Sequence, residues 1–241
     1  MKVEIWSDYV CPFCYIGKRH FEEALKQFPD KESIEVIYKS FELDPNASRD
    51  GNPNVYDMLA AKYGMTREQA IANTDQITRQ AKAVGLDYKM DSAIQTNTFD
   101  AHQLACYAET KGKGKEMTER LLKAHFVDSL HVGQHETLAD LAAEVGLDRE
   151  EVLHMLQDGD FADQVHSDEQ EARQLGVQGV PFFVINRKYA VSGAQPSEVF
   201  LNALLKAWSE NQPLQTIAGS DDGVVCTDEG CAVPGQEDKL S

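Results

Sequence analysis

Two cysteines separated by two residues, Cys11 and Cys14, lie where a short β-type segment changes into a helical pattern. Residues 2–6 alternate between apolar and polar, which predicts a strand, and apolar residues then recur at helical spacing over 12–28. A Cys-x-x-Cys pair at such a junction can close a small disulfide and open it again. The pair therefore predicts redox chemistry at the start of the first helix.

The position of each cysteine in this helix predicts a different role. Pro12 suits the first helical position, because its missing N–H is one that the helix cannot pair there, and this places Cys11 at the N-cap. Unpaired backbone N–H groups and the helix dipole favour negative charge at that end, so we expect Cys11 to be the attacking thiolate. Cys14, one turn further in, is expected to resolve the mixed disulfide. A zinc half-site is the alternative, but the sequence offers no second ligand pair, so no metal is expected.

Composition narrows the class of protein. The 241 residues suffice for one large domain or two small ones, and no apolar run approaches the length of a membrane span. A formal net charge of −17 disfavours nucleic acids and anionic membranes as partners. Five cysteines, an odd number, are not typical of a structural disulfide framework, and the N-terminus does not resemble a signal peptide. We therefore expect a cytoplasmic protein that binds neither nucleic acid nor membrane.

The remaining pattern predicts strands at both ends of a helical centre. A second strand over 34–41 would complete a β-α-β unit with parallel strands. Residues 54–175 have the pattern of consecutive helices, divided by glycines and by capping residues. A buried strand, its hairpin partner and a final helix follow over 181–208. The chain is therefore expected to have an α/β fold with an all-helical module inserted between strands.

Four stretches of the sequence together resemble the FrnE-like cytoplasmic branch of the DsbA family of thiol–disulfide oxidoreductases and isomerases. They are Ser7 to Gly17, Ser40 to Pro45, Thr96 to His102 and Gly179 to Phe183. The resemblance covers about residues 1–212 and implies a thioredoxin fold with a large helical insertion. It implies a thioredoxin-like domain over 1–45 and 177–213 and a helical domain over 46–176. The remaining residues, 214–241, are rich in glycine and acidic residues and are expected to form an acidic flexible tail.

The resemblance also implies which residues form the site. In this family the bond before the active-site proline is cis, which here is Val180–Pro181, and it presents a backbone edge where an extended substrate can pair as an added strand. An ordinary trans proline at a strand start is the alternative. Pro12 and Phe13, between the cysteines, are expected to contact the substrate. His102 is expected either to line the cleft or to be a buried structural histidine.

The expected function is disulfide exchange with protein or peptide substrates, catalysed by Cys11 and Cys14. No cofactor beyond the cysteines is expected, with glutathione as an optional co-substrate, and the chain is expected to be a monomer or a homodimer. Two alternatives stay open. A glutathione-dependent isomerase or transferase of the kappa type shares the fold but usually has Ser at the first active position. A holdase-like module would use an apolar cleft to bind unfolded chains.

A second pair of cysteines, Cys226 and Cys231, lies in the acidic C-terminal stretch. Four intervening residues, one of them Gly230, allow a local disulfide. We interpret the pair as a candidate second redox pair that relays oxidising equivalents to Cys11 and Cys14. The alternative is a labile disulfide, or an occasional pair of metal ligands, without a catalytic role.

The residue between the cysteines also predicts the redox potential. Periplasmic DsbA proteins have a His where this chain has Phe13, and Phe13 supplies neither a proton donor nor a positive charge to the Cys11 thiolate. We therefore predict a reduction potential within about −270 to about −120 mV and toward the thioredoxin end of that range. Equilibration with glutathione buffers measures it, and a potential as high as that of DsbA would contradict the prediction.

Overall fold

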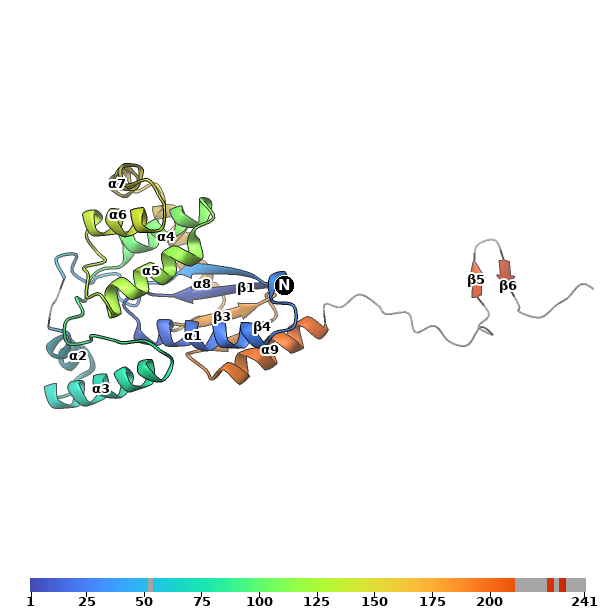
Figure 1. The fold of residues 1–241 in the computed structure, drawn as a ribbon, viewed down its shortest axis with the longest axis horizontal. Helices are drawn as coiled ribbons and strands as arrows, with labels where there is room; N and C mark the ends of the chain where they lie inside the picture. The colour runs from blue at the N-terminus through green and yellow to red at the C-terminus, as the bar shows by residue number, and fades with distance from the viewer. Residues whose placement is uncertain (52–53, 211–224, 228–229, 233–241) are drawn as a thin grey trace, which may run out of the picture. The chain divides into compact units, whose positions relative to one another are not determined.

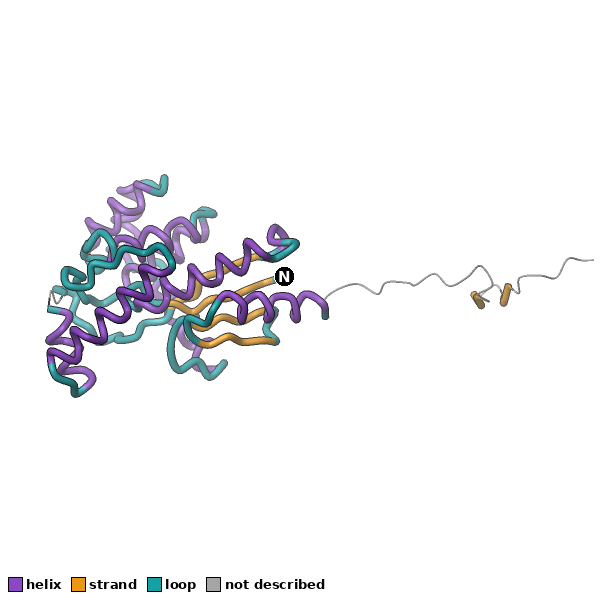
Figure 2. Tube along the Cα trace, turned by 60° about the horizontal axis from the view of Figure 1, so that its bottom comes forward, coloured by secondary structure: helices purple, strands orange, loops and turns teal. Residues whose placement is uncertain are grey.

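Four strands form one mixed sheet in the order β2–β1–β3–β4. The strands β1 (Lys2–Ser7) and β2 (Glu35–Ser40) run parallel and are connected through helix α1 (Pro12–Gln27) and a short 3₁₀ helix, η1 (Lys31–Ser33). The strand β3 (Phe182–Ile185) pairs antiparallel with β1, and β4 (Tyr189–Ser192) pairs antiparallel with β3. The predicted β-α-β unit and hairpin are confirmed, and Figure 2 shows the strands side by side with helices around them.

This computed structural model describes residues 1–51, 54–210, 225–227 and 230–232, in two compact units, Met1–Trp208 and Ser209–Ser241. Helix α9 (Ser197–Ser209) follows the sheet. The helices between β2 and β3 confirm the expected helical stretch; they are α2 (Val55–Tyr63), α3 (Arg67–Ala83), α4 (Phe99–Thr110), α5 (Gly114–Phe126), α6 (His135–Glu144), α7 (Arg149–Asp158) and α8 (Ala162–Gln174). The sheet and these helices belong to the same unit, and the boundaries predicted between a thioredoxin-like and a helical domain stay a prediction.

None of the described helices has the length and apolar character that crossing a membrane requires.

The ends of these helices follow from local sequence. Thr66 and Gln69 form the predicted capping box of α3, each side chain accepting a hydrogen bond from the backbone N–H of the other. Asp148 caps α7 by accepting from the Glu151 N–H at 2.8 Å. Gly64 ends α2 with a φ of 64°, a left-handed conformation that glycine adopts without steric cost.

Apolar side chains cover both faces of the sheet. On one face, Phe183 of β3 packs against Phe21 of α1 and Phe200 of α9, with ring centroids 5.4 and 4.5 Å away. On the other face, Trp6 of β1 packs against Ala172 of α8. Consecutive strand residues point to opposite faces, so a strand buried on both sides has apolar residues at nearly every position, as predicted for β3.

A separate core joins the start of α1 to the inserted helices. Cys14, Tyr15 and Ile16 of α1 belong to it together with buried residues of α4 to α7, among them Leu104, Leu121, Leu138 and Met155. Figure 1 shows α4 to α7 on one side of α1 and the α2–α3 pair on the other. The helix that carries the cysteines is therefore held by the insertion as well as by the sheet.

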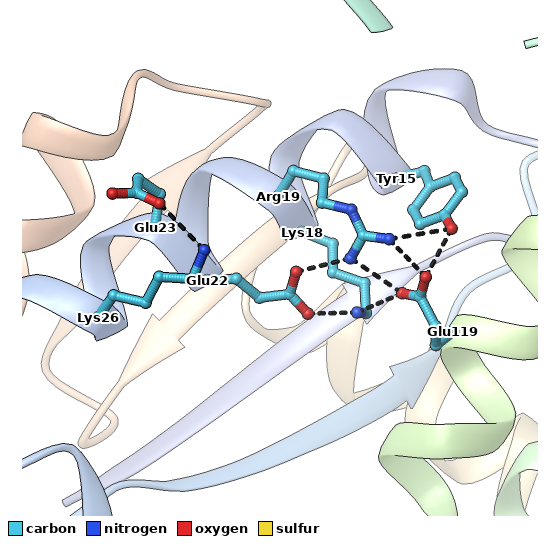
Figure 3. Close-up of polar contacts among 7 residues, drawn as sticks. All are labelled: Tyr15, Lys18, Arg19, Glu22, Glu23, Lys26 and Glu119. Atoms are coloured by element: carbon cyan, nitrogen blue, oxygen red, sulfur yellow. Dashed lines mark hydrogen bonds and ion pairs between the residues drawn. The ribbon is translucent and has the colours of Figure 1, made fainter. Parts of the chain in front are cut away.

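An ion-pair network at the surface also joins α1 to the insertion (Figure 3). Glu119 of α5 accepts hydrogen bonds from Tyr15 Oη and Lys18 Nζ, both at 2.6 Å, and from Arg19 Nη1 at 3.1 Å. Lys18 and Arg19 also pair with Glu22, one turn along α1. Partial burial would raise the pKa of Glu119, but the bonds from Arg19 and Lys18 lower it to about 2. Glu119 is therefore the carboxylate that connects the two helices.

The second unit contains a short hairpin. The strands β5 (Val225–Thr227) and β6 (Gly230–Ala232) pair antiparallel, and Cys226 lies directly opposite Cys231 in the register. The rest of the predicted acidic tail, residues 214–224, 228–229 and 233–241, lies outside the described residues.

Replacing Glu119 with Gln should lower the free energy of unfolding by about 1–2 kcal/mol at pH 7, because charge-assisted bonds between α1 and α5 are lost. The pKa of Glu119, about 2 in the folded chain, lies below the usual value of about 4.3. The contribution of the ionised Glu119 carboxylate to the free energy of unfolding is therefore complete above about pH 4.3 and is lost as the pH falls toward 2. In urea unfolding, the difference in the free energy of unfolding between wild type and variant should become smaller from pH 7 to pH 3.

Glu23→Gln is the matched control for this prediction. Glu23, also drawn in Figure 3, forms its ion pair with Lys26 on its own helix, and both side chains are exposed. Such a pair contributes about 0–1 kcal/mol. A loss of stability in Glu119→Gln that matches the control, or that does not change with pH, would contradict the role given to Glu119.

Candidate active site

The two cysteines lie at the start of α1, as predicted. Cys11 is the N-cap residue, with an extended backbone (φ −90°, ψ 112°), and Pro12 follows as the first residue of the helix. The Cys14 N–H donates to the Cys11 carbonyl oxygen at 3.0 Å. Both thiols are free, and no acidic side chain lies in the first turn of the helix. The positive end of the helix dipole is therefore directed at Cys11 without a competing carboxylate from that turn.

The loop before β3 lies against this helix start. The Val180–Pro181 bond is cis, as the family resemblance implies, and Cys11 Sγ lies 3.6 Å from the Val180 carbonyl oxygen. The Pro181 ring packs against Gly17 of α1, where an added Cβ would lie 3.0 Å from Pro181 Cγ. Glycine at position 17 therefore permits the close approach that brings the cis-proline loop to Cys11.

Cys14 lies deeper in the fold than its partner. Its side chain accepts a hydrogen bond from the Asp8 N–H, with a distance of 3.4 Å between N and Sγ. Burial, followed by the effect of the neighbouring Cys11, holds the pKa of Cys14 well above its usual value. Cys11 borders a cavity, whereas Cys14 does not border either cavity described below. This difference agrees with the predicted roles, attack by Cys11 and resolution by Cys14.

A tyrosine that the sequence pattern did not single out holds the segment between the cysteines. Tyr88, in the segment between α3 and α4, donates a hydrogen bond from its hydroxyl to the Pro12 carbonyl oxygen at 2.8 Å. Its ring lies between Tyr15 and Phe126, at centroid distances of 6.2 and 4.6 Å. Tyr88 thus connects the first turn of α1 to the aromatic core of the insertion.

Asp8, between β1 and α1, connects the cysteines to two other stretches that carry the family resemblance. Its Oδ2 accepts from the Leu43 N–H at 2.7 Å, and its Oδ1 lies 3.5 Å from His102 Nε2. Burial would raise the pKa of Asp8, but His102, the Leu43 N–H and Thr98 together lower it. Since the Asp8 backbone N–H also contacts Cys14, one ionised residue joins the redox pair to both stretches.

His102, for which a cleft position and a buried structural position were both expected, is buried in the fold. Its residue is 1% exposed, its ring lies 4.8 Å from that of Tyr9, and it borders neither cavity. Asn97 joins the same two stretches nearby, because its Nδ2 donates to Glu42 Oε1 and to the Pro45 carbonyl oxygen, both at 3.1 Å. These contacts explain why residues far apart in the sequence occur together in the resemblance.

Two cavities flank the active-site helix, and Phe13 borders both. The first, of about 600 Å³, lies beside Cys11 and Pro12 and is closed on its far side by α2 and α3. The second, of about 500 Å³, lies against the cis-proline loop and is bordered by Val180 and Pro181. The residues predicted to bind the substrate, Pro12, Phe13, Val180 and Pro181, therefore lie around Cys11.

The remaining cysteines lie apart from this arrangement or outside the described side chains. Cys106 Sγ lies 3.6 Å from Ser40 Oγ, and burial raises the pKa of Cys106 to about 11. The side chains of Cys226 and Cys231 are not among those described, so their redox role stays a prediction. Among the described residues, no group of His, Cys, Asp and Glu side chains has the arrangement of a metal site.

Comparisons with known proteins agree with this geometry. The sequence model of the DSBA-like thioredoxin domain family matches residues 2–205. The Bacillus subtilis (strain 168) protein YwbO is 30% identical over 203 residues, which cover 84% of this chain and 94% of that protein. The crystal structure of a probable DsbA oxidoreductase from Streptomyces coelicolor is 47% identical, with a TM-score of 0.84 over 98% of this chain and 100% of that chain. The cytosolic disulfide reductase DsbM from Pseudomonas aeruginosa, solved with GSH, shares the fold at 18% identity and a TM-score of 0.61, over 86% of this chain and 100% of that chain.

Asp8→Asn should lower the free energy of unfolding by about 1.5–3 kcal/mol at pH 7, because the acceptor of the Leu43 N–H hydrogen bond and the group facing His102 lose their charge. The folded-state pKa of Asp8 lies below its usual value. The contribution of the ionised Asp8 carboxylate to the free energy of unfolding is therefore complete above about pH 3.9 and is lost as the pH falls through the folded-state pKa. Thermal unfolding from pH 7 to pH 3 measures the change. Asp140→Asn, which removes one exposed partner of Arg149, is the control. An equal loss in both variants would contradict the role of Asp8.

Proposed function

The chain belongs to the DSBA-like thioredoxin domain family, and from this membership and the geometry of Cys11 and Cys14 we propose that it exchanges disulfides with protein or peptide substrates. One observation carries the proposal: an N-cap cysteine faces a cis-proline loop and borders a cavity, while its partner lies one turn further in and borders neither cavity. A substrate segment that pairs along the Val180 backbone brings its own sulfur to Cys11.

The reaction proceeds in two steps. The Cys11 thiolate attacks one sulfur of a substrate disulfide, a bond forms between them, and the second substrate sulfur leaves as a thiolate that takes up a proton. Cys14 then loses its proton and attacks Cys11 Sγ, which forms the Cys11–Cys14 disulfide and releases the first substrate sulfur as a thiolate. Two electrons have then passed from the pair to the substrate, and the reverse sequence oxidises a substrate dithiol.

The surroundings of the cysteines support this division of labour. The helix N-terminus stabilises charge on Cys11, which is the sulfur that attacks and that later leaves. Burial keeps Cys14 protonated until the mixed disulfide has formed, so it does not compete for the substrate. The Asp8 N–H, which donates to Cys14 Sγ, can stabilise the charge that this sulfur acquires during resolution.

We further propose that the enzyme works in the cytoplasm, as a FrnE-like member of the family that needs no cofactor. A Cys-x-x-Cys pair in a reducing compartment is typically catalytic, and one relative of this fold is by name a cytosolic disulfide reductase. Glutathione is proposed only as an optional co-substrate. The Cys226–Cys231 pair is proposed as a second redox pair, because residues directly opposite in an antiparallel hairpin lie within disulfide range.

Cys11→Ser should abolish insulin reduction in a turbidity assay, because no other described cysteine faces the cis-proline loop. Cys14→Ser should instead accumulate a mixed disulfide with the substrate, visible on a non-reducing gel, since the resolving sulfur is missing. Cys106→Ser is the matched control and should keep wild-type turnover, because Cys106 contacts Ser40 rather than the site. Full activity in Cys11→Ser would overturn the proposal.

A further inference from the structure

The hydroxyl group of Tyr88 reaches the peptide unit that follows the attacking cysteine. Tyr88 Oη donates a hydrogen bond to the Pro12 carbonyl oxygen, with 2.8 Å between the two oxygens. The carbonyl oxygen of the first residue of an α-helix accepts one bond from the N–H four residues later, and its second lone pair stays available. Tyr88 therefore supplies a second hydrogen bond to an oxygen that lies in the active-site turn itself.

Tyr88 is held in place as a permanent donor. Its residue is 5% exposed, and its ring lies between those of Tyr15 and Phe126. The next residue is fixed as well, because the Lys89 N–H donates to the Phe126 carbonyl oxygen at 2.7 Å. Burial, followed by charge on Cys11, raises the pKa of Tyr88, so its hydroxyl stays protonated at neutral pH. The influence of Cys11 also places the attacking sulfur within electrostatic reach of this hydroxyl.

The other end of the same peptide unit, the Phe13 N–H, lies where it can bind a charged Cys11 sulfur. In a helix, the side chain of the N-cap residue lies beside the N–H groups of the second and third helical residues, which here are Phe13 and Cys14. The Cys14 N–H donates to the Cys11 carbonyl oxygen, whereas the Phe13 N–H donates to no backbone oxygen of the described residues. The Cys11 thiol makes no capping hydrogen bond. The Phe13 N–H is therefore available when Cys11 loses its proton.

A hydrogen bond at one end of a peptide unit strengthens the donor at its other end. The unit is delocalised by resonance, so a bond to its oxygen draws electrons away from its N–H, and hydrogen bonds in such a chain strengthen one another by about 10–30%. Side-chain cations do not replace this effect. Among the described residues around the two cavities, Lys62 is the only Lys or Arg, and its Nζ pairs with Asp44 Oδ2 at 3.0 Å. Stabilisation of charge on Cys11 therefore depends on backbone N–H groups.

We propose that Tyr88 is a positioning residue that tunes the redox equilibrium of the pair, because its bond to the Pro12 carbonyl strengthens the backbone donor available to the Cys11 thiolate. The inference rests on the proposed function, in which Cys11 carries the charge in the reduced enzyme. Two glutathione thiols then reduce the Cys11–Cys14 disulfide to the Cys11 thiolate and the Cys14 thiol, while they form glutathione disulfide and release one proton. The bond from Tyr88 stabilises the products of this reaction and so favours the reduced enzyme.

The first test removes the hydroxyl and keeps the ring. In Tyr88→Phe, the equilibrium constant for reduction of the pair by glutathione should fall about 2- to 10-fold, the range of one net hydrogen bond. Equilibration with glutathione buffers, followed by acid quenching and separation of the two forms, measures the constant. Tyr15→Phe is the matched control: it removes a hydroxyl from a ring of the same stack, but that hydroxyl donates to Glu119, so the constant should not change. An unchanged constant in Tyr88→Phe, or an equal fall in the control, would overturn the inference.

The second test observes the peptide unit itself. Only two Pro-Phe sequences occur in the chain, Pro12–Phe13 and Pro181–Phe182, so protein with ¹³C in the proline carbonyl carbons and ¹⁵N in the phenylalanine amides gives two signals in an HNCO spectrum. In reduced Tyr88→Phe, the Phe13 amide proton should move upfield, while the Phe182 signal stays in place as the internal reference. Incorporation of 3-fluorotyrosine in place of Tyr88 nearly keeps the size of the side chain and strengthens the donor, so it should move the Phe13 proton downfield and decides the matter where Tyr88→Phe does not fold. A Phe13 signal that moves no more than the Phe182 signal would contradict the inference.

These measurements also separate the two proposals. If the wild-type protein forms no Cys11–Cys14 disulfide in any glutathione buffer, the proposed function itself fails. If the disulfide forms but the equilibrium constant and the Phe13 shift do not depend on Tyr88, only the inference fails. A purely structural role of Tyr88 would lower the free energy of unfolding in urea without changing the constant, and that result would also count against the inference.

Discussion

The start of α1 is the constraint on which the rest of the site depends. Pro12 fixes the first turn of the helix, and the two-residue spacing then gives the cysteines different surroundings. Both cysteines are buried, but Cys11 is the N-cap beside a cavity and the cis-proline loop, whereas Cys14 lies one turn further in and borders neither cavity. A single helix terminus therefore gives different surroundings to the sulfur proposed to attack, Cys11, and the sulfur proposed to resolve the mixed disulfide, Cys14.

The inserted helices hold this terminus in place as well as covering it. Tyr88 binds the Pro12 carbonyl oxygen, and Glu119 binds three side chains of α1 through the network in Figure 3. Asp8 joins the cysteines to Leu43 and to the α4 helix through His102. The insertion therefore both supports the start of α1 and lines the cavity beside Cys11.

Local patterns in the sequence predicted much of this arrangement. Contacts between residues far apart in the sequence could not be predicted in this way. The N-cap position of Cys11, the capping box at Thr66 and the doubly buried strand β3 depend on residues within a few positions, where spacing is informative. Asp8 and Leu43 are 35 residues apart, and Tyr15 and Glu119 are 104 apart. No periodic pattern connects such pairs, so their contacts appeared only in the fold. The role of His102 stayed open for the same reason, since its partner lies before α1.

The most direct test of the account is the order in which the cysteines react. Reduced protein is treated at neutral pH with less than one equivalent of iodoacetamide, and the modified peptides are identified by mass spectrometry over time. The account predicts that Cys11 is alkylated first, about tenfold or more ahead of Cys14 and Cys106, because of these three described cysteines only Cys11 combines a helix N-terminus with access to the cavity. Preferential or equal labelling of Cys14 would contradict it.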